Sequence, residues 1–339
     1  MGAPVSSEVQ TTARIALAGD TMLGRGVADA LIRDRDAPLL APEVVEQLAS
    51  ADAVVVNLEC CISDRGTPFP DPRKPFFFRA PPVAAERLAE LGVDAVTLAN
   101  NHALDYGPQA LLDTLRHLER AGVAAVGAGA DDSCAREPVV LRCGALRVRV
   151  VAFSDHPAAY AAAAGQPGIA YVDLRSGLPD WASAAARPGP DCDAVLVTPH
   201  WGPNMVSTPL RRVRRAAEAL VGAGATLVAG HSAHVFHGVA DRVLFDLGDF
   251  LDDYAVDREL RNDMGLLWVV ELSPDGPRRI RALPLALEYC FTRRASAAES
   301  DWIERRLRHL CKPFGTDVER AGGLIEVRPG PPPKREAWR

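Results

Sequence analysis

The fold is decided most clearly by residues 95–107, which read Ala-Val-Thr-Leu-Ala-Asn-Asn-His-Ala-Leu-Asp-Tyr-Gly. The first four residues form a short apolar run, and a helical pattern follows over residues 108–121. A buried strand that leads through a loop into a helix is the repeating unit of sheets covered by helices. The polar residues Asn100, Asn101 and His102 lie where this strand is expected to end.

The same order of strand, loop and helix recurs along the chain. Working outward from residue 95, we predict strands at residues 14–17, 53–56, 123–126, 194–198 and 226–229. Helical patterns cover residues 28–34, 43–50, 83–91 and 210–221. We also expect a hairpin at 139–153, strands at 243–245, 265–272 and 280–287, and a helix at 302–310. The sequence therefore predicts an α/β protein with helices on the faces of a sheet.

The chain shows no internal repeat and no convincing linker, so we expect one domain over residues 14–328. Residues 1–13 are polar and are expected to form a flexible N-terminus, and residues 329–339 a Pro-rich mobile tail.

The composition excludes several classes of partner. The 339 residues carry a net charge of -6 without a basic block, so we expect no nucleic acid partner. No run of about 18 apolar residues is present, so we expect no membrane span. The first residues lack a secretory signal pattern, which predicts a cytoplasmic protein. The sequence does not determine the oligomeric state.

Polar side chains follow five of the predicted strands directly. They belong to Asp20, Glu59, the pair Asn101 and His102, His200, and His231. In α/β sheets, ligand sites form where several strand ends converge. Carboxylates and imidazoles bind divalent ions such as Zn, Mn or Fe, and a carboxylate can bridge two such ions. The sequence therefore predicts a metal site built from these strand ends.

Five segments in a fixed order also resemble a known family. They are Gly19-Asp20-Thr21-Met22-Leu23-Gly24, Asn57-Leu58-Glu59, Asn100-Asn101-His102-Ala103-Leu104-Asp105-Tyr106-Gly107, His200-Trp201-Gly202 and Gly230-His231-Ser232-Ala233-His234-Val235. Together they resemble the CapA family, named for capsule poly-γ-glutamate synthesis, which is similar to the calcineurin-like metallophosphoesterases. The resemblance covers about residues 14–249, which is most of the chain.

The resemblance implies a four-layer α/β/β/α sandwich of the metallophosphoesterase type and a role for each matching residue. Asp20 and His234 would hold one ion, and Glu59 would bridge it to a second ion. The ligands of that second ion would be Asn101, His200 and His231. His102 would be the general acid/base, oriented by Asp105. The family name implies a peptide-like or poly-glutamyl substrate.

The chain also departs from the patterns it resembles. Asp20-Thr21-Met22 stands where phosphoesterases usually have Asp-x-His, and Leu58-Glu59 stands where they usually have Gly-Asp. Gly248-Asp249-Phe250 replaces the Gly-Asn-Phe of many relatives, and Asp249 is a candidate to support a ligand from behind. The first ion loses one imidazole ligand, so we expect one or two divalent ions per chain, among Mn, Zn, Fe, Ca and Mg.

Three functions are compatible with this pattern. The first is a metal-dependent hydrolase that cleaves a phosphoester or amide bond, with His102 protonating the leaving group. The second is a peptide epimerase, in which His102 and a second base, His156 or His237, remove and return a Cα proton of a ribosomal (lasso) peptide. The third is a non-catalytic metal-binding protein of capsule biosynthesis.

Overall fold

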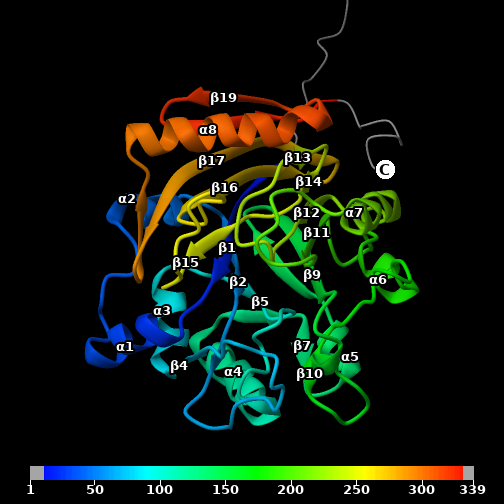
Figure 1. Ribbon diagram of the computed structural model, residues 1–339. Coiled ribbons are helices and arrows are strands. Elements are labelled where there is room, and N and C mark those ends of the chain that lie inside the picture. Colours follow the sequence, from blue (N-terminus) through cyan, green and yellow to red (C-terminus); the bar gives the residue numbers. More distant parts are fainter. Residues whose placement is uncertain (1–10, 331–339) are drawn as a thin grey trace, which may run out of the picture.

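The structure is a computed structural model that describes residues 11–330, and its core is built on two β-sheets (Figure 1). The first sheet has the strand order β19-β20-β17-β16-β1-β2-β5-β6. Its parallel half consists of β1 (Ala13–Thr21), β2 (Ala53–Leu58), β5 (Ala95–Thr97) and β6 (Ala124–Val126). Its antiparallel half consists of β16 (Met264–Ser273), β17 (Gly276–Glu288), β19 (Asp317–Ala321) and β20 (Leu324–Arg328). Two short strands lie outside this order: β15 (Asp249–Leu251) pairs with β1, and β18 (Phe291–Arg294) pairs with β17.

The second sheet has the order β13-β14-β12-β11-β9-β8. Its strands are β8 (Val139–Cys143), β9 (Leu146–Ser154), β11 (Ala194–His200), β12 (Leu227–Ala229), β13 (Val239–Ala240) and β14 (Val243–Leu244). Two small two-stranded pairs flank the sheets: β3 (Cys61–Ile62) with β4 (Arg79–Ala80), and β7 (Ala128–Gly129) with β10 (Gly168–Ile169).

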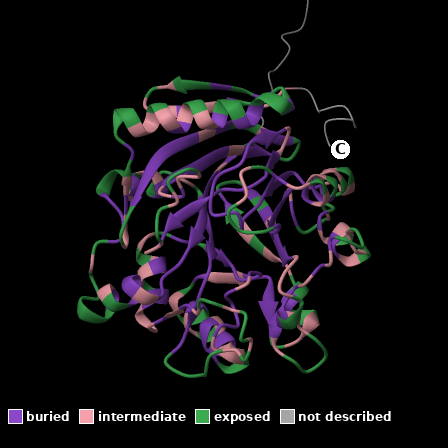
Figure 2. Ribbon diagram, viewed as in Figure 1, coloured by how far each residue is buried: buried purple, intermediate pink, exposed green. Residues whose placement is uncertain are grey.

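Alternation along the strands shows how the layers stack. In β1, Ile15 and Leu17 pack into the core between the two sheets, whereas Ala16 and Ala18 pack into the core beneath the helices. Because successive side chains of a strand point to opposite faces, a strand buried on both faces must be covered on both sides. Strands β2, β5, β11 and β12 are accordingly buried along their whole length, whereas the helices expose their outer faces (Figure 2).

Two sets of helices form the outer layers. The first sheet is covered by α1 (Arg25–Arg33), α2 (Pro42–Ala49), α3 (Val83–Glu90) and α4 (Gly107–Ala121). The second sheet is covered by α5 (Asp132–Arg136), α6 (Asp180–Ala185) and α7 (Arg211–Ala223). The layers therefore follow the order α/β/β/α, which confirms the predicted sandwich of the metallophosphoesterase type. Helix α8 (Ala297–Cys311) instead closes one end of the core between the sheets.

Most predicted elements are present, but several limits differ. Asp20 and His200 were predicted to follow their strands directly. They instead lie within the last residues of β1 and β11. β1 is longer than expected because β2 and β15 both pair with it at Asp20 and Thr21. The sequence did not reveal α5, α6 or the hairpin of β19 and β20, and α8 begins five residues earlier than predicted.

The domain limits stay predictions, because residues 1–10 and 331–339 of the predicted termini lie outside the described residues. Strand β1 begins at Ala13, one residue before the predicted start of the domain. Of the helices within residues 11–330, none combines the length and hydropathy that crossing a bilayer requires.

The topology brings the carboxyl ends of the parallel strands of both sheets to one edge of the sandwich. Strands β1, β2 and β5 run parallel in the first sheet, and β9, β11 and β12 run parallel in the second. A bridge between His200 and His231 continues the second sheet beyond β12. The polar residues at these ends are thereby collected in one place.

Candidate metal centre

Three predicted ligands form the tightest part of the site. Asp20, Glu59 and His234 are buried, and each offers a ligand atom within 4.8 Å of the others. His234 Nδ1 lies 3.3 Å from Asp20 Oδ2 and 3.9 Å from Glu59 Oε2. Two carboxylates and an imidazole at this spacing could hold a divalent ion.

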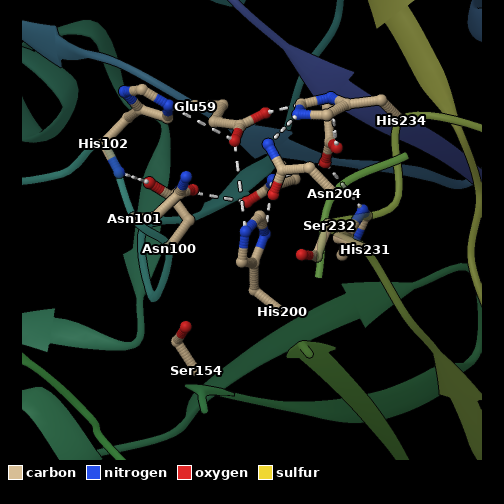
Figure 3. A network of polar contacts seen from close by, with 12 residues as sticks. Glu59, Asn100, Asn101, His102, Ser154, His200, Asn204, His231, Ser232 and His234 are labelled. Carbon is tan, nitrogen blue, oxygen red and sulfur yellow. Dashed lines mark hydrogen bonds and ion pairs between the residues drawn. The ribbon is translucent and has the colours of Figure 1, made fainter. Parts of the chain in front are cut away.

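The other predicted ligands surround this group (Figure 3). His231 Nδ1 lies 3.5 Å from Asp20 Oδ1, and His200 Nε2 lies 4.0 Å from Glu59 Oε1. Asn101 follows β5, and its side-chain oxygen is buried although the residue is partly exposed. The structure therefore brings all six predicted ligands to one edge of the sheets.

Buried polar atoms without hydrogen bonds test whether these residues fit a metal. Among the described residues, such atoms include Asp20 Oδ2, both Glu59 oxygens, Asn101 Oδ1, His200 Nε2 and His231 Nδ1. Buried polar atoms almost always have a partner, because leaving one unpaired costs about 1–3 kcal/mol. Six such atoms on five neighbouring residues fit a centre whose missing partner is a cation. The residue types match the donors that borderline divalent ions prefer.

The charges of the centre also indicate a missing cation. Burial and the neighbouring Asp20 raise the pKa of Glu59 well above its usual value. Burial also raises the pKa of Asp20, but His231, His234 and His200 outweigh it and the pKa is lowered overall. Burial lowers the pKa of His234, yet Glu59 and Asp20 outweigh burial and raise it. The carboxylates thus compete for the few positive charges nearby, which a divalent cation would relieve.

Two asparagine side chains contact the predicted ligands. Asn57 in β2 donates a hydrogen bond of 2.7 Å to Asp20 Oδ1, and its own oxygen accepts from Thr97 and Asn100. Asn57 is a polar residue near the end of an apolar strand, and this position is the feature that marks it in the sequence. Asn204 lies 2.9 Å from His234 Nε2, and no pattern in the sequence marks it.

Asp249 contacts the same ring nitrogen of His234 that faces Asp20 and Glu59. Its Oδ1 lies 2.8 Å from His234 Nδ1, and the pairing of β15 with β1 places it beside Asp20. Its other oxygen, Oδ2, is buried without a hydrogen bond. A carboxylate that contacts a ligating histidine fixes the orientation of its ring.

His102 and Asp105 form a buried pair beside the cluster. The carboxylate of Asp105 lies 2.6 Å from His102 Nδ1, and it accepts hydrogen bonds from the backbone of Phe78 and the hydroxyl of Tyr160. Lys74 Nζ lies 3.0 Å from the same carboxylate. These contacts fix the imidazole so that its Nε2 faces Glu59, at 3.9 Å from Oε1.

The environment of His102 favours its neutral form. Burial lowers the pKa of His102 to about 4, although Asp105 acts in the opposite direction. With Nδ1–H donated to Asp105, the unprotonated Nε2 faces the cluster near neutral pH. The ring is also stacked on Phe78, with 4.1 Å between the ring centroids. This geometry can accept a proton at one defined atom and return it.

The two candidate second bases lie in different surroundings. His156 lies 2.6 Å from Asp155, its ring centroid is 5.2 Å from that of His200, and it lines a cavity of about 360 Å³ together with His102. His237 is buried and donates from Nε2 to the carbonyl of Val206 at 2.8 Å, and its described contacts do not reach the cluster. Neither contact tests a catalytic role, which stays a prediction for both residues.

The chain thus combines an α/β/β/α sandwich with a cluster of acidic, amide and imidazole groups at its strand ends, which defines a candidate metal-binding protein. Residues 14–254 match the model of the family described as bacterial capsule synthesis protein PGA_cap. The chain belongs to this family, which confirms the predicted relationship to CapA proteins.

Relatives with known names agree with this assignment. The chain is 30% identical over 370 residues to a probable polyglutamine synthesis accessory protein of Mycobacterium tuberculosis, covering 93% of this chain and 96% of the relative. It is 27% identical to the capsule biosynthesis protein CapA of Bacillus anthracis, covering 74% of this chain and 62% of the relative. A solved phosphatase from Mycoplasma pneumoniae superimposes with a TM-score of 0.49 at 14% identity, over 86% of this chain and 98% of that one. That superposition is too loose to bear on the chemistry.

Proposed function

We propose that this protein is a metal-dependent hydrolase that cleaves an amide or phosphoester bond in a peptide-like or poly-glutamyl substrate. The observation that carries the proposal is the set of six unpartnered buried atoms, on Asp20, Glu59, Asn101, His200 and His231, beside an oriented His102. The names of the relatives, which refer to polyglutamine synthesis and capsule biosynthesis, favour a glutamyl or peptide-like substrate.

The centre would be held by the six predicted ligands, Asp20, Glu59, Asn101, His200, His231 and His234. A divalent ion there supplies Lewis acidity toward a carbonyl or phosphoryl oxygen and lowers the pKa of a water molecule. Buried surroundings strengthen these electrostatic effects, because little solvent is present to screen them.

His102 performs the proton transfers in this proposal. Its neutral Nε2 accepts a proton from the attacking water molecule and then donates it to the nitrogen or oxygen of the leaving group as the bond breaks. Asp105 holds Nδ1–H and stabilises the imidazolium that forms between the two transfers. Lys74 and Tyr160 fix Asp105 in turn, so the pair is rigid before the substrate binds.

The test is turnover by metal-loaded protein on two classes of substrate. Aryl phosphoesters report phosphoester cleavage, and poly-γ-glutamate and glutamyl peptides analysed by mass spectrometry report amide cleavage. We expect cleavage of one class, and we expect His102→Ala to lower kcat by about 10²–10⁴-fold with unchanged metal content. The control is His309→Ala, which removes an exposed imidazole on α8.

Failure to cleave any member of the panel, or equal turnover by His102→Ala, would contradict the proposal. Incorporation of solvent deuterium at Cα without cleavage would replace it with the epimerase, for which His156 lines the same cavity as His102. Metal binding with neither reaction would favour a non-catalytic accessory role.

A further inference from the structure

A second cavity opens beside the metal centre and differs from it in character. It has a volume of about 570 Å³, and His102 and His234 contribute to its lining. The remainder of its wall includes the side chains of Phe76, Phe78 and Tyr254. We call this space the aromatic cavity. Because it shares these two residues, the aromatic cavity adjoins the metal centre.

Exposed apolar side chains are concentrated at this cavity. The described residues include six large apolar side chains that are exposed, and three of them line the aromatic cavity: Phe76, Met205 and Tyr289, with 56%, 37% and 74% exposure. Single exposed apolar residues are ordinary, but a cluster of them at one place marks a binding surface. The other three, Ile32, Val140 and Val256, do not line it.

The one arginine in the wall is already paired with a carboxylate. The guanidinium of Arg25 forms an ion pair with Asp253, with Nε 3.0 Å from Oδ1, while Oδ2 of Asp253 accepts from the backbone of Gly26. The guanidinium also lies over the rings of Phe78 at 4.8 Å and Tyr254 at 5.4 Å. These contacts stiffen the wall and leave the guanidinium engaged with Asp253 and the rings.

We propose that the aromatic cavity binds an apolar, preferably aromatic, side chain on the residue next to the reacting bond of a peptide substrate. This proposal rests on the proposed function, because it names the substrate class of the same site. A poly-glutamyl chain would place a carboxylate against aromatic rings and an arginine that is already paired with Asp253, which costs desolvation. An aromatic ring instead gains edge and face contacts with Phe76, Phe78 and Tyr289.

The test measures binding separately from turnover. Calorimetry at low temperature compares blocked pentapeptides that differ only at the central position, which is Phe, Leu or Glu, and mass spectrometry follows their integrity. We expect the Phe peptide to bind at least about tenfold more tightly than the Glu peptide. Phe76→Ala and Tyr289→Ala should each weaken Phe-peptide binding by roughly 3- to 10-fold, because each removes one ring from the wall.

The matched control is Val140→Ala, which removes an exposed apolar side chain on β8 and should bind as the wild type does. Phe76 and Tyr289 are exposed, so their replacement should preserve the melting temperature, which is measured for each variant. Equal or tighter binding of the Glu peptide, or wild-type affinity in both cavity variants, overturns the proposal. Selective binding of the Phe peptide without cleavage supports the cavity while contradicting the hydrolase. Cleavage of poly-γ-glutamate without preference for Phe supports the hydrolase and overturns the cavity proposal.

Discussion

Replacing Asp105 with Asn should damage both stability and turnover, because four donors converge on its carboxylate. These donors are His102 Nδ1, the backbone of Phe78, the hydroxyl of Tyr160 and Lys74 Nζ. An amide has one oxygen acceptor, and its nitrogen would face groups that also donate. The change therefore removes a charge-assisted contact to His102 and leaves Lys74 without its buried counter-charge.

The expected loss of unfolding free energy follows from these contacts. Breaking a buried ion pair by removing one partner costs about 3–5 kcal/mol. The pair here is deeply buried, since the carboxylate is 0% exposed and the lysine side chain only 14% exposed. We expect Asp105→Asn to lower the free energy of unfolding by about 3–5 kcal/mol, a large part of the 5–15 kcal/mol typical of a whole domain.

Turnover should fall for a related reason. Without the carboxylate, nothing fixes the tautomer that presents Nε2 of His102 to the cluster, and the imidazolium loses its stabilising charge. We expect kcat to fall by about 10²–10⁴-fold while metal content is unchanged. Urea unfolding and steady-state kinetics measure the two effects. The control is Asp301→Asn, which breaks an exposed ion pair with Arg320 and should change neither quantity appreciably.

A folded Asp105→Asn variant with wild-type kcat would refute the assignment of His102 and Asp105 as a catalytic pair. A free energy of unfolding within about 0.5 kcal/mol of the wild type would refute the inference that the carboxylate is needed by its four donors.

Two further predictions concern other histidines. Asp249→Ala should free the ring of His234 and weaken metal affinity by about 10- to 100-fold in a chelator competition, and an unchanged affinity would show that Asp249 does not orient His234. Burial lowers the pKa of His237 to about 4, so the folded protein binds its proton less readily than the unfolded chain does. The contribution of neutral His237 to the free energy of unfolding is fully present above the unfolded pKa of about 6.5 and is lost as the pH falls toward 4. The loss is at most about 3 kcal/mol for a difference of roughly 2.5 pKa units. His237→Gln should flatten the dependence of unfolding free energy on pH in that window, whereas parallel curves for variant and wild type would contradict it.

The sequence predicted which residues meet at one edge of the sheets better than it predicted the limits of the strands. Asp20, Glu59, His200 and His231 could be found because each lies at or near the end of an apolar strand, and strand order alone brings such ends together. Asn204 could not be found, because it reaches His234 from a loop without periodicity. Its contact is created by the tertiary structure.

The errors in strand limits have similar causes. β1 extends through Thr21 because its last residues pair both with β2 and with β15, which lies more than 200 residues later. The hairpin of β19 and β20 is short and half-exposed, and it is stabilised by its pairing with β17 and by contacts with α8. Local sequence patterns do not contain such distant contacts. The pattern of residues 317–328 therefore predicts these two strands only weakly.

Metal content per chain tests the proposed centre most directly. Elemental analysis of freshly purified protein should give one to two divalent ions per chain, as expected for ligands that include Asp20, Glu59 and His234. Glu59→Gln should lower the content, and His309→Ala should leave it unchanged. Metal no higher than the buffer background after incubation with Mn²⁺, Zn²⁺ and Fe²⁺, or the same content in Glu59→Gln as in the wild type, would contradict the metal centre.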